Sequence, residues 1–321
     1  MCSFVAVFTF IIPRMNMKKN MMITLAALLL CALAAQAQLL YRISGNGLQR
    51  PSFIIGTYHL APASFADSIA GVRVALGSVT QVYGELDMAE LASDSAATRL
   101  SRAMTLPPGT TLLTLLNADE QARLNAALRS LLGYDLTNPF VAGQLGNLTP
   151  MALQTQLSVL LCMKTQGGFD PTSTFDDYFQ RVATSMGMKV GGLESVDDQI
   201  KVLFASQTLE RQKEMLLCFA DHLDLQEQLT ADVIKAFFSQ DLNAIEEATN
   251  AQMGGNCDST PQEEEMFIYA RNDNWVRRMP AIMSEAPTFF AVGAGHLPGD
   301  RGVLAQLRRA GYTVTAVTAQ E

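Results

Sequence analysis

The sequence has few of the features by which enzymes are usually recognised. Only three of its 321 residues are histidine, and it contains no HExxH, no GxSxG, no GxxxxGK(S/T) and no GxGxxG after a predicted strand. It also lacks a linker rich in proline, glycine or serine and a repeat with a period of 20 to 50 residues. Any chemistry must therefore come from residues dispersed along one domain.

Positive charge is also scarce. The chain has 23 Lys and Arg against 31 Asp and Glu, a formal net charge of -8, and no basic run interleaved with aromatic residues. Because no basic field can gather phosphates, nucleic-acid binding is not expected. Hydrophobic side chains make up 49% of the sequence, which is enough for a large core and excludes a disordered tail.

The first 37 residues have the pattern of a secretory signal. Lys18 and Lys19 precede an uncharged apolar run at 21–35, and a small-x-small site follows at Ala37. We expect removal after Ala37. Residues 1–14 lack the usual basic start, so we expect a mis-annotated beginning, with Met15 or Met17 as the initiator.

The signal sets the expected location. The apolar run is shorter than the about 20 residues that span a bilayer, and no stop-transfer pattern follows, so no transmembrane segment is expected after removal. Leu30 is too large for the position before a lipidated Cys31, so anchoring is not expected. The protein should be periplasmic or extracellular, with a net charge of -11, because three basic residues leave with the signal.

Three cysteines remain after the signal, namely Cys162, Cys218 and Cys257. An oxidising compartment allows one disulfide and one leftover thiol. Cys162 and Cys218 both lie in apolar helical contexts, so they are interpreted either as two buried small hydrophobic residues or as a bridged pair. None of the three has the setting of a nucleophile.

The order of predicted elements indicates an α/β fold. Apolar or β-branched runs bounded by glycine or polar residues predict strands at 40–43, 53–57, 81–86, 189–193, 288–292 and 312–317. Asn117 with Glu120 predicts the start of a helix that Gly133 ends, and a second helical block is expected at 208–251. Residues 38–321 should form one domain with a helix-rich insertion at about 89–185.

Two of the three histidines follow predicted strands with the same spacing. His59 and His296 each lie three residues after a glycine, Gly56 and Gly293, whereas His222 lies in a predicted helix and is expected at its surface or end. A glycine at a strand end permits a sharp turn, after which the histidine projects over the carboxyl edge of the sheet. The alternative is two structural histidines that close strand ends.

Carboxylates occur at equivalent places. Glu85 and Glu194 each end a predicted strand. Two histidines and one or two glutamates form a set that binds Mn, Co, Zn or Fe with positions left for water and substrate. A metal-free site in which a histidine is the base and a glutamate orients it is the alternative.

These short motifs recur in a known order. They are Gly56-Thr57-Tyr58-His59, Gly84-Glu85-Leu86-Asp87, Thr174 to Phe179, Gly192-Leu193-Glu194-Ser195 with Gln199, Arg271-Asn272 with Trp275, and Val292 to Asp300 around His296. In them the chain resembles the TraB/GumN family, also called TraB/PrgY/GumN. That family is related to Tiki-type metalloproteases and more distantly to erythromycin esterase and ChaN-like proteins.

The resemblance implies a Tiki/erythromycin-esterase/ChaN-like mixed sheet with flanking helices and a metal-dependent hydrolase site. His59, Glu85 and His296 take the positions of metal ligands for a divalent ion such as Mn, Co or Zn. Glu85 and Glu194 are the candidate catalytic carboxylates. Tyr58 departs from the usual Ile or Val, which puts substrate preference in question.

Arg271 is a candidate substrate-binding residue together with Tyr58. An arginine can clamp a substrate carboxylate with two hydrogen bonds, but beside the acidic run at 263–265 it could equally form an ion pair on a helix surface. Asp176 and Asp177 are interpreted as helix-capping residues rather than ligands, and the acidic run itself as a solvated helix start.

Three functions compete. The first is an exported metal-dependent hydrolase that acts on a peptide or small-molecule substrate. The second is a non-catalytic exported protein that binds a peptide signal or haem. The third is an esterase that needs no metal and uses His and Glu.

Overall fold

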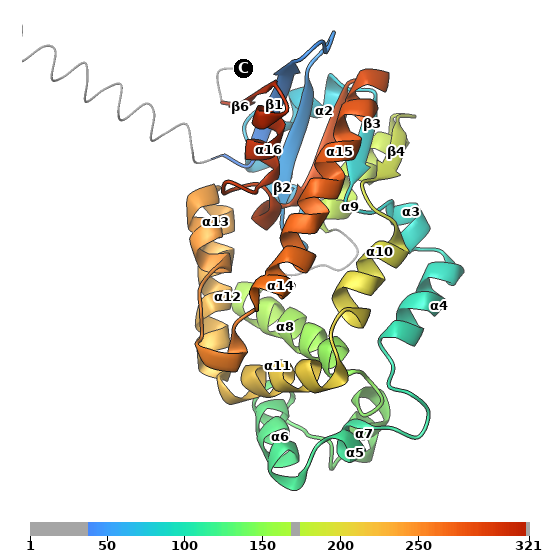
Figure 1. The fold of residues 1–321 in the computed structure, drawn as a ribbon, viewed down its shortest axis with the longest axis vertical. Helices are drawn as coiled ribbons and strands as arrows, with labels where there is room; N and C mark the ends of the chain where they lie inside the picture. The colour runs from blue at the N-terminus through green and yellow to red at the C-terminus, as the bar shows by residue number, and fades with distance from the viewer. Residues whose placement is uncertain (1–37, 168–173, 319–321) are drawn as a thin grey trace, which may run out of the picture. The chain divides into compact units, whose positions relative to one another are not determined.

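A six-stranded mixed sheet forms one end of the protein and helices form the other (Figure 1). The computed structural model describes residues 38–167 and 174–318, so the predicted signal and initiator lie outside the described residues. The strands are β1 (Leu40–Gly45), β2 (Ser52–Thr57), β3 (Gln81–Gly84), β4 (Lys189–Gly192), β5 (Thr288–Gly293) and β6 (Tyr312–Ala316). All six predicted strands are confirmed, with ends shifted by at most two residues.

The sheet has the order β4-β3-β5-β2-β1-β6. The strands β4, β3, β5 and β2 run parallel, whereas β1 is antiparallel to both β2 and β6. The central strand β2 is buried along its whole length and β5 along all but its last residue, because helices cover both faces of a parallel sheet. Parallel pairing brings the carboxyl ends of four strands to one edge, and this edge holds the motifs predicted above.

Helices connect β3 to β4. They are α3 (Met88–Leu91), α4 (Asp94–Ala103), α5 (Leu112–Leu115), α6 (Ala118–Leu132), α7 (Pro139–Leu145), α8 (Pro150–Gln166) and α9 (Phe175–Ser185). The predicted caps of α6 are confirmed: the Asn117 side chain accepts from the Glu120 N–H, the Glu120 side chain accepts from the Asn117 N–H, and Gly133 has a φ of 79°.

More helices lie between β4 and β5. They are α10 (Val196–Ile200), α11 (Leu209–Asp221), α12 (Leu223–Phe238), α13 (Leu242–Thr249), α14 (Pro261–Glu264) and α15 (Ala270–Glu285). The predicted block at 208–251 is therefore three helices, and exposed His222 separates the first two, as expected. Short 3-10 turns occur at Ala63–Ser68 (η1), Gly255–Cys257 (η3) and Ala294–His296 (η5), π-helical turns at Lys201–Ala205 (η2) and Glu265–Tyr269 (η4), and helices α2 (Val72–Gly77) and α16 (Val303–Arg309) flank the sheet.

The interior contains two large apolar clusters. One surrounds the sheet and includes Phe175, Phe289 and Trp275. The other is rich in leucine and joins helices α6 and α8 to α11, which comes after β4. The helical end is therefore built from two separate stretches of the chain. Within residues 38–167 and 174–318, no helix is both long and apolar enough to cross a membrane.

Two predictions require correction here. Cys218 forms a disulfide with Cys257, with their Cα atoms 5.4 Å apart, and Cys162 is a free, partly buried thiol. A bridge needs Cα atoms within about 7 Å, which the η3 turn provides by packing on α11. The acidic run does start a helix, but Glu263 is buried against Arg211 rather than solvated.

Candidate functional site

The register of the parallel strands explains why distant residues meet. Thr57 pairs with Gly293 across β2 and β5, and Gly84 pairs with Ala291 of β5 and with Gly192 of β4. The residues that follow each of these strands therefore leave the sheet at the same edge. They include Glu85, Glu194, His59 and His296.

Arg271 is the centre of the cluster at this edge. It lies on α15 and is only 9% exposed. Its Nη2 donates to Oε2 of Glu85 at 2.6 Å and to Oε1 of Glu194 at 2.7 Å, and its Nε donates to Oε2 of Glu194 at 3.1 Å. The interpretation of Arg271 as a surface ion pair is therefore wrong, because a buried guanidinium needs buried carboxylates to compensate its charge.

Glu194 has its hydrogen-bonding capacity well filled. Besides Arg271, its Oε2 accepts from the indole N–H of Trp275 at 3.1 Å and its Oε1 accepts from the amide of Gln199 at 3.2 Å. Such a carboxylate is held in one position, which favours a role in orienting Arg271.

Glu85 keeps its negative charge in a buried place. Its Oε1 accepts from the backbone N–H of Gly293 at 2.7 Å, and the Nε2 of His296 is 4.0 Å away. Burial alone raises the pKa of Glu85, whereas positive charge on His296 and on Arg271 lowers it. Because His296 is neutral near pH 7, the Arg271 guanidinium and the Gly293 N–H hold the pKa of Glu85 below its usual range.

His296 is neutral and its tautomer is fixed. Burial lowers its pKa to about 4. Its Nε2 lies 3.0 Å from Nη1 of Arg271, which can only donate, so Nε2 accepts and Nδ1 donates to Oδ1 of Asn272 at 2.7 Å. The amide nitrogen of Asn272 donates to the carbonyls of Arg301 and His296, which confirms that its oxygen faces the imidazole.

His59 has a different environment. Its side chain is 71% exposed, against 7% for His296. Its Nδ1 is 2.9 Å from Oδ2 of Asp176, whose Oδ1 accepts from the Thr57 hydroxyl. The Asp176 carboxylate raises the pKa of His59. Within the described chain, the hydrogen bonds of His59 do not reach Glu85 or His296.

Tyr58 lies beside this cluster rather than in it. Its ring packs on Phe237 at a centroid distance of 5.4 Å, and it borders a neighbouring cavity together with Cys162. Burial raises the pKa of the Tyr58 phenol, so the group stays protonated. The structure thus brings together Glu85, Glu194, Arg271 and His296, places His59 at the solvent edge, and leaves Tyr58 outside.

The strand-end glycines are needed for close approach. A Cβ on Gly56 would lie 3.0 Å from the Cα of Ala294, and one on Gly293 would lie 3.1 Å from Oε1 of Glu85. Neither glycine has a positive φ. A side chain at either position would therefore disturb a close contact, and at Gly293 the contact is with the candidate site itself.

Several residues that hold the site have no site role in the sequence analysis. Asp176 was expected to cap a helix, but the α9 cap is Thr174, and Asp176 holds His59. Asn272 and Trp275 were visible in motifs without a function. Trp275 lies four positions after Arg271 on one helix, and this spacing is the signal that could have placed it, because positions three or four apart share a face.

Two cavities border the cluster. The first has a volume of about 700 Å³ and reaches Asn272 and Gly295. The second has a volume of about 850 Å³ and is lined by Glu194 and Arg271. A molecule of peptide size therefore has space on either side of the buried charges.

The donor chemistry of the two histidines fits a divalent metal. Each holds Nδ1 against an oxygen, that of Asp176 or Asn272, which is how metal-binding imidazoles are usually oriented. Glu85 is the matching ionised carboxylate. In residues 38–167 and 174–318, however, no three His, Cys, Asp or Glu side chains are grouped as a metal site, and Arg271 contacts the Nε2 of His296. An ion bound there would have to take the place of that contact.

Comparison with known proteins shows the family of the chain. The sequence profile of the TraB/PrgY/gumN family matches residues 39–316, and the chain belongs to this family. Metalloprotease TIKI2 of Danio rerio is 26% identical over 314 residues, covering 84% of this chain and 59% of that protein. Metalloprotease TIKI1 of Homo sapiens is 27% identical over 310 residues, covering 82% and 59%. The chain spans about three fifths of the length of these curated relatives. No solved structure matches it.

Proposed function

We propose that the chain is an exported hydrolase that cleaves peptide or related carbonyl substrates at the edge where Glu85, Glu194, Arg271 and His296 meet. The observation that carries the proposal is the buried cluster of one guanidinium, two carboxylates and a neutral imidazole. Similarity to proteins named metalloproteases supports the same class of reaction.

The residues divide the work by charge. Glu85 is the acceptor that can take a proton from an attacking water, as its oxygen bonds to the carbonyl carbon, whereas the Nε2 of His296 accepts from Arg271 and helps to hold it. Arg271 supplies fixed positive charge for the oxyanion that forms, and Glu194 holds Arg271 in place. The proton then passes to the leaving group. When bound, a divalent metal supplies Lewis acidity and lowers the pKa of a water molecule.

We further propose His59, Glu85 and His296 as the ligands of that ion, with Mn, Co or Zn as candidates. Support comes from the orientation of both imidazoles through Nδ1 and from the names of the relatives. We also propose that the chain shares its fold with Tiki-type proteases, erythromycin esterase and ChaN-like proteins.

Export is proposed on two grounds. The pattern at 1–37 is that of a signal, and the Cys218–Cys257 disulfide suits an oxidising compartment. We infer a periplasmic or extracellular location. Residues 38–321 then act as one domain with its insertion at about 89–185.

The test is hydrolysis of a peptide library by protein purified without a His tag, whose metal content is measured. We expect cleavage that is lost in His296→Gln and Glu85→Gln and retained in His222→Gln, the matched change at an exposed histidine. Activity that survives exhaustive chelation would point to the metal-free esterase. Ligand binding without turnover would point to the binding protein.

A further inference from the structure

The two cavities beside the site carry opposite charge. The run of α14, η4 and α15 passes between α12 and α13 on one side and α10 on the other (Figure 1). The first cavity is bordered by α12 and α13, and the second by α10 and η2. The first cavity is lined by Asn272, whose side chain accepts from His296, and the second is lined by Arg271 and Glu194, so each lies beside the buried cluster.

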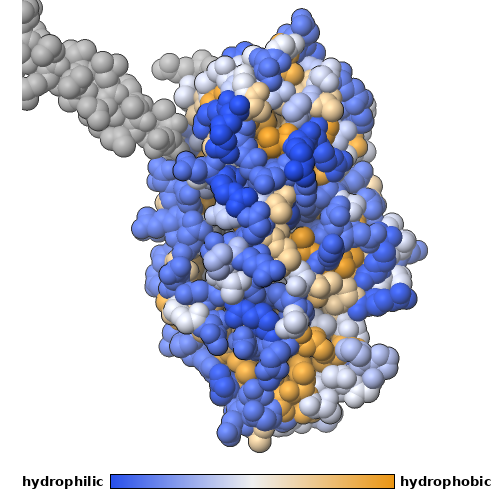
Figure 2. Space-filling view, in the orientation of Figure 1, coloured by the Kyte–Doolittle hydropathy of each residue, from blue (hydrophilic) through white to orange (hydrophobic). Residues whose placement is uncertain are grey.

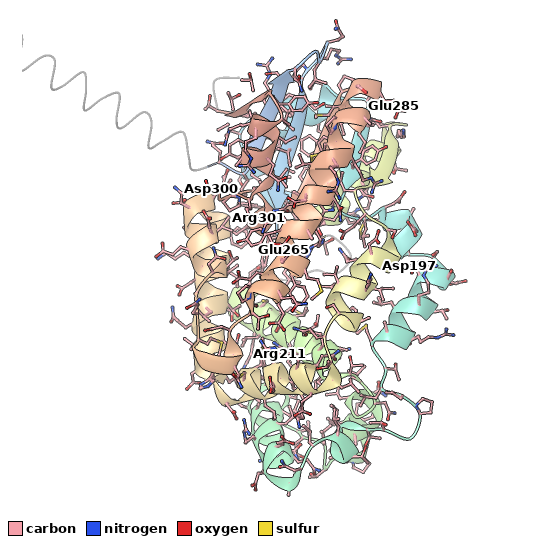
Figure 3. All side chains as sticks on the ribbon, in the orientation of Figure 1. Asp197, Arg211, Glu265, Glu285, Asp300 and Arg301 are labelled. Carbon is pink, nitrogen blue, oxygen red and sulfur yellow. A yellow bond between two sulfur atoms is a disulfide. The ribbon has the colours of Figure 1, made fainter. Side chains whose placement is uncertain are left out.

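The first cavity is acidic. Carboxylates of four residues border it, namely Glu246, Asp258, Glu264 and Asp300. Arg301 is the one cation among the described residues of its lining, and its guanidinium is already bound to Glu265 and Asp273. Figure 3 shows Asp300, Arg301 and Glu265 close together between α13 and α15.

Apolar walls accompany this charge. Leu229 and Val233 of α12 and Phe267 and Ile268 of η4 line the same cavity. Among the acids of this cavity, Asp258 already accepts hydrogen bonds from the backbone N–H groups of Met253 and Gly254. The space therefore suits an aliphatic stem that ends in a positive charge, as in lysine or arginine.

The second cavity is basic. Lys201, Arg277 and Arg278 line it together with Arg271. Its lining also holds two acids, Asp198 and Glu194, of which Arg271 binds Glu194, so four cations are set against two carboxylates. The charge that remains for a ligand is positive.

We propose that the substrate lies across the site with a basic group in the first cavity and an acidic group in the second. The inference rests on the proposed function, because it names the substrate of that same site. Charge of one sign in a cleft with apolar walls concentrates the field and selects ligands of the opposite sign. A substrate that carries charge in the reverse order would meet like charges at both ends.

The experiment uses capped peptide pools with a neutral randomised centre and charged ends. One pair of pools has three Lys at one end and three Glu at the other, in either order, and two control pools have Lys or Glu at both ends. Binding is measured by calorimetry and cleavage by mass spectrometry. We expect one charge-separated pool to bind at least about tenfold more tightly than either control pool at low salt.

Matched variants assign the effect to the cavities. Glu246→Gln should weaken binding of the preferred pool about threefold to tenfold, whereas Glu247→Gln, its exposed neighbour on α13, should not. Lys201→Gln, in the second cavity, should also weaken binding of the preferred pool about threefold to tenfold, whereas the control Lys235→Gln should not. Tightest binding of the pool with Lys at both ends would overturn the inference, because the acidic surface would then explain it.

The outcomes separate the two proposals. Charge-selective binding without cleavage would contradict the hydrolase and support the polarity of the site. Cleavage without charge preference would support the hydrolase and overturn the polarity. Absence of both binding and cleavage would overturn the polarity as well.

Discussion

Arg271 shows what a single residue does in this protein. Its guanidinium faces the carboxylates of Glu85 and Glu194 and the Nε2 of His296, and its Cζ lies 4.8 Å from the centroid of the Trp275 ring. Removing one partner from a buried ion pair costs more than the pair contributes, because the remaining charge stays buried and unpaired. Here two carboxylates would be left together.

We therefore expect Arg271→Met to lower the free energy of unfolding by about 3 to 5 kcal/mol. Arg277→Met, an exposed arginine on the same helix, should change it by less than about 1 kcal/mol. Urea denaturation of both variants measures the difference. Adding Glu194→Gln to Arg271→Met should restore part of the loss, and an additive double variant would contradict the pairing.

At this scale the sequence predicts motif residues better than their partners. His59 and His296 each follow a strand and its final glycine within a few residues of sequence, so their positions at strand ends could be predicted from the sequence directly. The partner of His59, Asp176, lies 117 positions away and is set by tertiary packing, which spacing does not reveal. Burial of Arg271 likewise depends on α15 covering the sheet edge.

Elements were easier to predict than their assembly. The six strands and α6 carry strong local signals, namely apolar runs, a reciprocal cap and a glycine stop. The pairing of α11 with α6 and α8 into one leucine-rich core has no local signal, since α11 follows β4 in sequence. The disulfide partner was missed for the same reason, because Cys257 lies in an irregular turn.

The disulfide fixes the η3 turn that borders the first cavity. It links positions 39 residues apart, for which loss of loop entropy in the unfolded chain gives about 3 to 4 kcal/mol. Cys257→Ser should lower the free energy of unfolding by roughly that amount, and Cys162→Ser should not. Denaturation with and without reductant provides the check. Equal sensitivity of both variants to reductant would show that the bridge does not form.

Glu263 links α14 to α11 and makes stability depend on pH. Hydrogen bonds from Arg211 lower its pKa from 4.5 to about 2 in the folded protein. The folded protein therefore favours the ionised form of the Glu263 carboxyl group. The stabilisation that Glu263 gives the folded protein is complete above pH 4.5 and is lost as the pH falls toward 2.

Glu263→Gln should cost on the order of 2 kcal/mol at pH 7, and its deficit against the unmodified protein should shrink between pH 4.5 and 2. Glu264→Gln, at the exposed neighbouring position, is the matched control and should show little deficit at any pH. Unfolding curves across that range measure both. A deficit that stays constant would mean that Glu263 does not titrate as described.

Charge is unevenly distributed over the whole molecule. Hydrophilic residues cover most of the face in Figure 2, and apolar residues gather mainly toward the helical end. The overall excess of acid hides the basic second cavity, which composition alone could not reveal. Net charge thus argues against nucleic-acid binding, but it does not predict that the two cavities beside the site carry opposite charge.

The same acidity decides how metal binding must be tested. Without its first 37 residues the chain carries a net charge of -11, so divalent ions will gather on its surface whether or not a site exists. An ion that binds only the folded state at a hundredfold excess over its dissociation constant stabilises it by about 2.7 kcal/mol. For a domain of this size that is a rise in Tm of about 4 to 5 °C.

We expect Mn, Co or Zn to raise the Tm of chelator-treated protein, and His59→Ala and His296→Ala each to abolish the rise. His222→Ala should keep it, because His222 is exposed between α11 and α12 and far in sequence from the strand ends. Melting curves are compared with those of the His59→Ala/His296→Ala double variant. Surface binding acts equally on all of these proteins, whereas a site acts only on those that retain both imidazoles. An equal rise in the double variant would therefore assign the ions to the acidic surface and remove His59, Glu85 and His296 as ligands.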